Sequence, residues 1–198
     1  KKYHPFSEQF MKDKFGKEDD ESIKNLVFKN ALVSEDGSIL FNAEEYFATT
    51  GYRDNPGGSR IRVTRYHYND MVGAKLNTSG DLVWVRNINK TEVTQQDGAY
   101  ASYSSFTKDN NTYFFISTAA ENPQQISNQR IMFKQGYSRN RNVFLIKLDA
   151  KGDMSYEKII DAKEARLPLM VSKPLIINDD ILFYAKRGSK KQLVKVGF

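Results

Sequence analysis

Two kinds of short β-hairpin recur along this chain with nearly the same spacing, and this recurrence restricts what the chain can fold into. The clearest hairpin, at 72–86, reads as a strand, a glycine-containing turn and a second strand. A segment of the same character lies at 143–158 and places Gly152 where the first hairpin has Gly80. Glycine supplies the positive φ that tight hairpin turns need. We therefore interpret both segments as strand–turn–strand units.

A second kind of hairpin precedes each of these units. Its polar turn leads into an aromatic or aliphatic strand at three places, with turns at 35–37, 109–111 and 178–180. The matching phenylalanines, Phe41, Phe115 and Phe183, are spaced at close to the interval of the first hairpin. Two different hairpins that share one period predict repeats of four antiparallel strands, which we name a to d.

Consecutive four-stranded meanders are the sequence pattern of propeller blades. We expect an all-β, partial β-propeller-like fold over 24–198, with blades at about 26–88 and 100–160 and an incomplete one at 169–198 that lacks its last strand. A propeller closes with about four or more blades. The chain is therefore expected to belong to a larger propeller with further N-terminal blades, to an open stack of blades, or to an oligomeric ring. A sandwich of two sheets is the alternative architecture.

The N-terminal segment, 1–23, follows a different pattern from the repeats. Phe6, Phe10 and Met11 lie at helical spacing, and Gly16 follows where a helix C-cap is expected. A run of charged residues then connects this segment to the first predicted strand. We expect a short helix whose aromatic face packs on the first blade.

The composition excludes several kinds of site. The chain has no cysteine, which rules out a disulfide framework, a thiol nucleophile and any cysteine-ligated metal or cluster. Its two histidines are too few for a multi-histidine metal site, so we expect no metal and no cofactor. No apolar run approaches the roughly 18 residues needed to cross a bilayer, so no transmembrane segment is expected.

Catalytic constellations are difficult to assemble from this sequence. His67 is a candidate for the histidine of a Ser-His-Asp triad, but the sequence has no G-x-S-x-G nucleophile elbow to accompany it. Glu44 and Glu45 are neighbours on a predicted strand, so their side chains point to opposite faces. A carboxylate pair from different blades, such as Glu45 with Asp70, is the enzymatic alternative. The sequence assigns no catalytic residue and favours a non-catalytic protein.

Positive charge is concentrated in two predicted insertions between strands b and c. The chain has a formal net charge of +6, and the insertions at 50–69 and 122–142 account for all of this excess. Aromatic residues accompany the cations in both. The candidate ligand-binding residues are Arg60, Arg62, Arg65, Tyr66, His67, Arg130, Lys134, Tyr137, Arg139 and Arg141.

Equivalent loops of stacked blades emerge on the same face, where insertions often form a binding surface. Arginine offers planar, bidentate donors to carboxylate, sulfate or phosphate groups. We therefore expect an anionic partner, such as an acidic polysaccharide or another component of the cell envelope, and no specific nucleic acid. The alternative is that the arginines only solvate two long loops. Because Ile61 and Val63 alternate with Arg60 and Arg62, a strand is expected within the first insertion, with both arginines on one exposed side.

Three segments of the chain resemble a known group of proteins. They are 10–16, 66–72 and 80–86 together with Lys90. With these segments the chain resembles the C-terminal part of uncharacterised propeller-like exported proteins of Bacteroidetes. The resemblance implies a propeller-like fold and export to the periplasm or the cell surface, and it implies no activity, substrate or catalytic residue. The first residues show no initiator methionine and no signal-peptide core, so we expect any targeting signal to lie outside this sequence.

Taken together, these features predict a non-catalytic binding or scaffold module of the cell envelope. The expected ligand is anionic and is held by the basic insertions between strands b and c. The alternative function is a carbohydrate-active enzyme whose carboxylates come from different blades.

Overall fold

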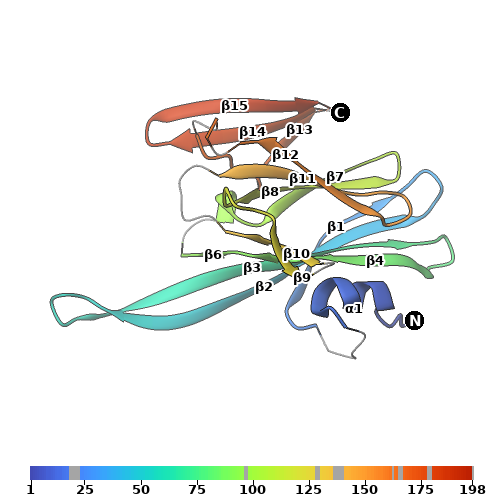
Figure 1. The fold of residues 1–198 in the computed structure, drawn as a ribbon, viewed down its shortest axis with the longest axis horizontal. Coiled ribbons are helices and arrows are strands. Elements are labelled where there is room, and N and C mark those ends of the chain that lie inside the picture. The colour runs from blue at the N-terminus through green and yellow to red at the C-terminus, as the bar shows by residue number, and fades with distance from the viewer. Residues whose placement is uncertain are drawn as a thin grey trace.

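The computed structural model describes residues 1–17, 23–95, 98–127, 130–135, 141–161, 163–164, 167–177 and 180–197. Within these residues the chain is mostly β, with one α-helix, α1 (Glu8–Phe15), and one short 3-10 helix, η1 (Gly98–Tyr100). Figure 1 shows antiparallel sheets stacked above the helix. The expected all-β class with a short N-terminal helix is confirmed.

Two sheets contain a run of four antiparallel strands in sequence order. In the first, β6 also pairs with β3. Its strands are β1 (Leu26–Val33), β2 (Ile39–Asp54), β3 (Arg60–Leu76), β4 (Leu82–Ile88) and β6 (Val93–Thr94). The second sheet consists of β7 (Tyr103–Lys108), β8 (Asn111–Thr118), β11 (Asn142–Leu148) and β12 (Met154–Ile160).

Two smaller sheets complete the described structure. The third sheet has three antiparallel strands, β13 (Leu175–Ile177), β14 (Asp180–Arg187) and β15 (Lys190–Gly197). The expected start of this unit near Leu169 forms only an isolated bridge to Ala185. The fourth sheet consists of β5 (Lys90–Thr91), β10 (Arg130–Lys134) and β9 (Gln124–Ser127), with β5 parallel to β10.

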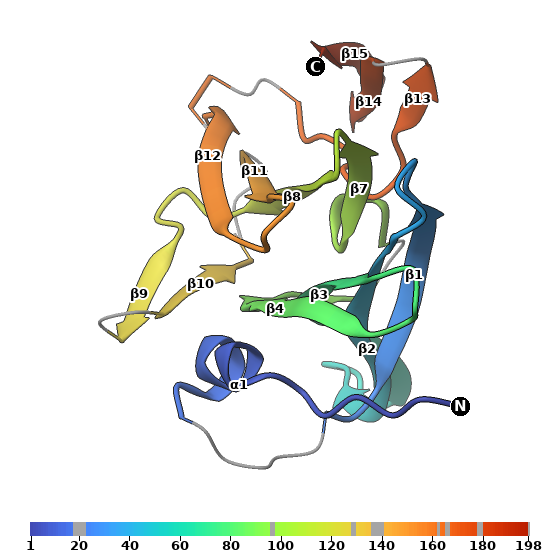
Figure 2. The same ribbon diagram turned by 90° about the vertical axis from the view of Figure 1, so that its right-hand side faces the viewer.

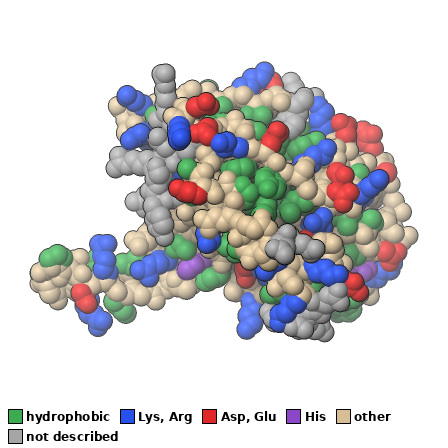
Figure 3. All heavy atoms as spheres, in the orientation of Figure 1, with side chains coloured by type: hydrophobic (Ala, Val, Ile, Leu, Met, Phe, Trp, Pro, Cys, Tyr) green, Lys and Arg blue, Asp and Glu red, His purple; other side chains and the backbone are tan. Residues whose placement is uncertain are grey.

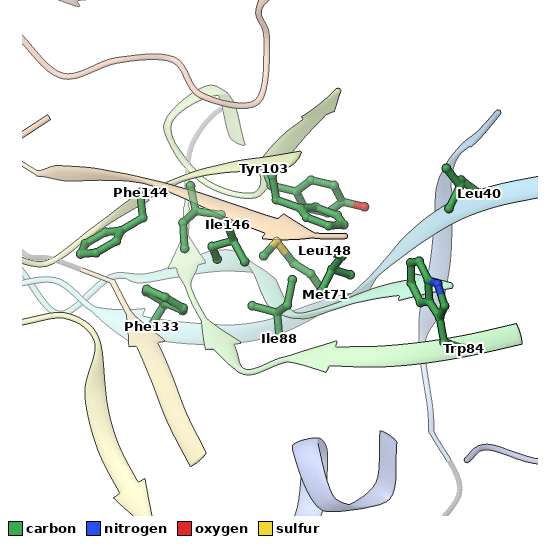
Figure 4. Packing of buried hydrophobic residues seen from close by; sticks show 11 residues of the cluster. Leu40, Met71, Trp84, Ile88, Tyr103, Phe133, Phe144, Ile146 and Leu148 are labelled. Carbon is green, nitrogen blue, oxygen red and sulfur yellow. The ribbon is translucent and has the colours of Figure 1, made fainter. Parts of the chain in front are cut away.

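Figure 2 shows the first three sheets next to one another in sequence order. Apolar side chains fill the space between neighbouring sheets. Between the first two sheets lie Met71 and Trp84 from one side and Ile146 and Leu148 from the other, as Figure 4 shows. Successive side chains of a strand point to opposite faces, so the continuous buried runs in β8 and β11 give the second sheet two apolar faces. Phe115 on the opposite face of the second sheet accordingly packs in a separate core with the third sheet.

The turns around Gly80 and Gly152 have the same geometry. Their φ values are 77° and 87°. In each turn the residue three positions earlier, Asn77 or Asp149, accepts a backbone N–H through its side-chain oxygen, from Asp81 at 2.8 Å in one turn and from Asp153 at 2.9 Å in the other. The two hairpins are β3–β4 and β11–β12, at the positions that the sequence pattern predicts.

Helix α1 covers the outer face of the first sheet. Ser7 caps its N-terminus, and Gly16 ends it with φ of 75° in the left-handed region. Phe10 and Met11 are buried and pack with Ala43, Val72 and other residues of β2, β3 and β4. The expected helix, its glycine cap and its position on the first sheet are confirmed.

The predicted insertion at 50–69 is not a loop. β2 and β3 continue through it as paired strands that end at Asp54 and Arg60, so the ribbon extends well beyond the body of the molecule (Figure 1). Each β-strand residue adds about 3.3 Å of length. The expectation of a strand within this insertion is confirmed, and its description as a loop is wrong because the ladder runs uninterrupted from Tyr46 to Asp54.

Candidate functional site

The projecting part of the β2–β3 ribbon is a basic surface, and we call residues 49–65 the arm. Thr49 pairs with Arg65 at its base, and Asp54 pairs with Arg60 at its tip. Arg53, Arg60, Arg62 and Arg65 are exposed along it, with Asp54 as the accompanying acidic residue. Figure 3 shows these basic side chains spaced along the ribbon rather than gathered in one patch.

The arm presents arginines on both of its faces. Side chains directly opposite each other share a face, so Arg62 lies beside Tyr52, whereas Arg65 lies beside Thr49 on the other face. Arg60 is on the Arg62 face. Its guanidinium stacks over the Tyr52 ring at 5.6 Å and its Nε lies 3.0 Å from the Asp54 carboxylate. The arrangement suits an extended anion that contacts the ribbon along its length.

Tyr66 and His67 lie at the base of the arm and are half-buried. The His67 ring stacks on Phe47 with centroids 4.3 Å apart, and its Nε2 lies 2.9 Å from Thr49 Oγ1. Tyr66 and His67 also pair with the short strand β6. These contacts fasten the arm to the first sheet.

The candidate residues of the second predicted insertion, 122–142, lie in different surroundings. Arg130 donates through Nε to the Asp13 carbonyl at 3.1 Å and through Nη2 to the Lys14 carbonyl, so it satisfies the C-terminal end of α1. Arg141 donates to the Tyr100 carbonyl at 3.1 Å. Lys134 is exposed. Two further candidates, Tyr137 and Arg139, lie outside the described residues.

A buried group of charges was not anticipated from the sequence. Lys90 Nζ lies 2.8 Å from Glu92 Oε2 and 3.1 Å from Glu44 Oε1, and it donates to the Tyr68 carbonyl at 2.8 Å. All three charged side chains are almost completely buried. Ser102 Oγ donates to Glu44 at 2.6 Å. The i, i+2 spacing of Lys90 and Glu92 is a signal that their side chains can meet, but Glu44 reaches them only through the fold.

Burial and the neighbouring charges shift the pKa values of this group. Burial alone would lower the pKa of Lys90, but the carboxylates of Glu92 and Glu44 outweigh it and raise the pKa above its ordinary value. Burial raises the pKa of Glu92 despite the neighbouring ammonium. Burial, with a smaller contribution from Glu44, also raises the pKa of Tyr103 far above its ordinary value, so its hydroxyl stays protonated and donates to Asn42 Oδ1 at 2.6 Å.

A groove adjoins the buried charges, between the first strands of the three stacked sheets. It consists of two connected hollows of about 470 and 390 Å³ that share Asn30, Ser105 and Ile176. Consecutive residues of β1 and β7 line it, which means that the strand edges, and not only one face, point into it. Figure 2 shows β1, β7 and β13 on the same side of the molecule.

The groove lining combines polar and apolar side chains and carries little charge. Asn30 Nδ2 donates to Ser105 Oγ at 2.8 Å across it, and Lys29 reaches from its wall to Glu44, with 3.2 Å between Nζ and Oε2. Ser104 Oγ is buried and has no hydrogen-bond partner among the described residues. Such groups can receive a small polar ligand.

Two pairs of acidic residues in the described part of the chain do not form the arrangement that glycosidases use. Glu45 and Asp70 both bind Lys14, at 3.3 and 2.7 Å, and both belong to the first sheet. Glu44 and Glu92 come from different segments, but both are buried around Lys90. Glycoside hydrolysis needs one carboxylic acid and one carboxylate on either side of a bound sugar. Neither pair offers such an opening.

Among the described residues, no helix combines the length and the apolar character needed to cross a membrane. The same residues contain no group of three or more histidine or acidic side chains placed to hold a metal ion. The chain matches no family model, no curated protein and no solved structure.

Proposed function

We propose that this chain is a non-catalytic binding or scaffold module of the cell envelope and that its arm binds an anionic ligand. The observation that carries the proposal is the arm itself, a two-stranded ribbon with Arg53, Arg60, Arg62 and Arg65 exposed beside Asp54. A ribbon that projects from the body contributes little to the core, so its length and charge point to a role in binding. The envelope location follows from the resemblance to exported proteins.

The geometry favours a linear polyanion over a compact one. Because Arg62 and Arg65 lie on opposite faces of the ribbon, a small anion would meet only some of the guanidinium groups. An acidic polysaccharide can follow the ribbon and present carboxylate or sulfate groups repeatedly to bidentate donors. Tyr52 is exposed beside Arg62 and adds a flat surface for a sugar ring.

We also propose that the three stacked sheets are consecutive blades of a propeller-like repeat. Two observations support it: the a-to-d order of strands in the first two sheets, and the matching turns at Gly80 and Gly152. The face-to-face packing of the sheets is the arrangement that blades adopt around an axis. In this arrangement β1, β7 and β13 are the innermost strands, and the groove lies beside the axis.

The proposed ligand contact is tested by retention on heparin resin at low ionic strength. The variant Arg60→Ala/Arg62→Ala/Arg65→Ala is expected to bind roughly 10–100-fold more weakly than the parent, since each exposed ion pair contributes about 0.5–1 kcal/mol. Binding of the parent should fall as salt is added. The matched control is Lys24→Ala/Lys151→Ala/Lys163→Ala, which removes the same charge from exposed positions elsewhere.

Equal weakening in both triple variants would show that net charge alone causes retention. If the arm variant elutes with the parent, the arm is not the contact surface and the proposal is wrong.

A further inference from the structure

The third sheet ends on a strand edge that is covered in the other two stacked sheets. The third strands of the first two sheets, β3 and β11, each pair with a fourth strand, β4 or β12. β15 is the third strand of its sheet and pairs with β14. In the part of the chain that the structure describes, its other edge has no paired strand.

The burial of the three corresponding strands differs sharply. In β11, six of seven residues are buried, and in β3 the stretch from Met71 to Ala74 is buried. In β15 no residue is buried, and the Leu193 side chain is 67% exposed. β15 therefore lacks the cover that β3 and β11 have: Val194 and Val196 pack against the core, but Leu193 is left exposed.

The outer face of the same sheet also carries exposed apolar side chains. Leu193 lies opposite Tyr184, and Leu175 lies opposite Leu182 on that face. Leu175 and Ile177 are 59% and 47% exposed. In Figure 1 this sheet forms one end of the stack, whereas α1 covers the other end. Apolar side chains left open on a strand edge and on the adjoining face are typical of a site that another strand covers.

We propose that β15 is a strand-addition site that accepts a fourth, antiparallel strand from a partner protein, and that this strand has acidic residues on its outward face. Pairing of an extended segment with a sheet edge is an established mode of recognition, in which main-chain hydrogen bonds supply affinity. The outward face of β15 carries Lys191 and Lys195 on either side of Leu193. An incoming strand with acidic side chains opposite the two lysines and an apolar one between them matches this pattern.

Charge also argues against a second copy of this chain as the occupant. In the symmetric antiparallel pairing centred on Leu193, Lys191 of each copy would lie opposite Lys195 of the other. Like charges directly opposite one another destabilise a sheet. Although Lys195 Nζ lies 2.6 Å from Asp180, that single carboxylate cannot neutralise both lysines.

The hydrogen-bonding groups needed for addition are available on β15. Arg187 and Lys190 pair across a two-residue turn, so their N–H and C=O groups bond to each other. Alternation along the strand then directs the N–H groups of Lys191, Leu193 and Lys195 away from β14. Proline at Leu193 would therefore remove a donor from the open edge and leave the β14–β15 ladder unchanged.

The test is a C-terminal extension that supplies the strand within the same chain, where its effective concentration is high. The extension is a glycine-containing turn followed by a short apolar strand with glutamates opposite Lys195 and Lys191. The extension is expected to raise Tm by about 3–6 °C. It should also slow amide exchange at Leu193 and Lys195 by roughly tenfold or more, because a local opening free energy of about 1.4 kcal/mol gives tenfold protection. The matched extension with lysines in place of the glutamates should give a clearly smaller shift.

Leu193→Pro tests whether the edge itself is used. Without an extension this variant should keep the parent Tm, and with the glutamate extension it should lose both the Tm shift and the amide protection. An unchanged Tm and unchanged exchange with the glutamate extension would overturn the proposal. So would equal effects of the two extensions, or a dimer of the parent chain that Leu193→Pro dissolves in equilibrium sedimentation.

Discussion

At the scale of single residues, the buried group around Lys90 combines large opposing energies. Each ion loses its hydration on burial, and only the close contacts with Glu44 and Glu92 offset that cost. The carbonyl of Tyr68 and the hydroxyl of Ser102 satisfy part of the remaining hydrogen-bonding capacity. The group joins β2 to β5 and to the segment before β7, so it sets how the first two sheets meet.

Lys90→Met is therefore expected to destabilise the protein by about 3–5 kcal/mol at neutral pH, because it leaves buried carboxylates without their cation. The pKa of Glu92, already raised by burial, would rise further, so the variant should gain stability relative to the parent as pH falls from 7 toward 5. In the parent, the raised pKa of Lys90 means that its contribution is complete below the unfolded-state pKa and is lost as pH rises through the folded-state value.

Urea denaturation at several pH values measures both effects. Lys29→Met is the matched control, since Lys29 also contacts Glu44 but is partly exposed, and it should cost no more than about 1 kcal/mol. A Lys90→Met variant as stable as the Lys29→Met variant at pH 7 would contradict this account of the buried group.

At the scale of elements, the two glycine turns look alike locally but lie in different surroundings. Both have positive φ. A Cβ added at Gly80 would meet nothing within 4 Å, whereas one added at Gly152 would lie 2.7 Å from the Trp84 ring. The Trp84 indole N–H donates to the Ala150 carbonyl at 3.1 Å, so the β11–β12 turn is docked on the first sheet. The β3–β4 turn contacts the N-terminal residues Lys2 and His4, which leave the space at the Gly80 Cβ position free.

Alanine at each position separates backbone strain from packing. Gly80→Ala is expected to cost about 1–2 kcal/mol, the strain of a left-handed conformation. Gly152→Ala should cost a further 1–3 kcal/mol, because the Trp84 ring must move. Chemical denaturation of the two variants checks the difference. If both lose the same stability, the contact between the turn and Trp84 does not exist in solution.

At the scale of the whole molecule, the stability of the stacked sheets does not depend on the arm. The cores between the sheets draw on Trp84, Phe115 and the residues around them, and no residue of the arm belongs to a core cluster. At the base of the arm, Phe47 and His67 stack on each other below the first arm pair, Thr49 with Arg65. The arm can therefore be shortened without loss of these contacts.

A variant in which Asn-Gly replaces residues 50–64 should fold with the stability of the parent, within about 0.5 kcal/mol. The dipeptide closes a two-residue turn between Thr49 and Arg65, which are already paired. Thermal unfolding tests stability, and heparin resin tests binding, which should be reduced. A large fall in Tm would mean that the arm is part of the folded core.

The sequence by itself determined the hairpins, their order and the N-terminal helix. These features depend on local rules: alternation of apolar residues, a glycine that supplies positive φ at Gly80 and Gly152, and a glycine cap at Gly16. It also located the basic segment that becomes the arm. Each of these signals lies within a few residues of the structure that it specifies.

The tertiary structure alone decided which charged side chains meet. Arg130 lies more than a hundred residues from the helix end that it satisfies, and Glu44 and Ser102 are 58 residues apart. The division of Arg62 and Arg65 between two faces required the register of β2 against β3. The exposure of β15 likewise required the position of every other strand. The physical reason is that charge pairing and burial depend on distances across the packed sheets. The periodicity of residues along a single strand does not specify those distances.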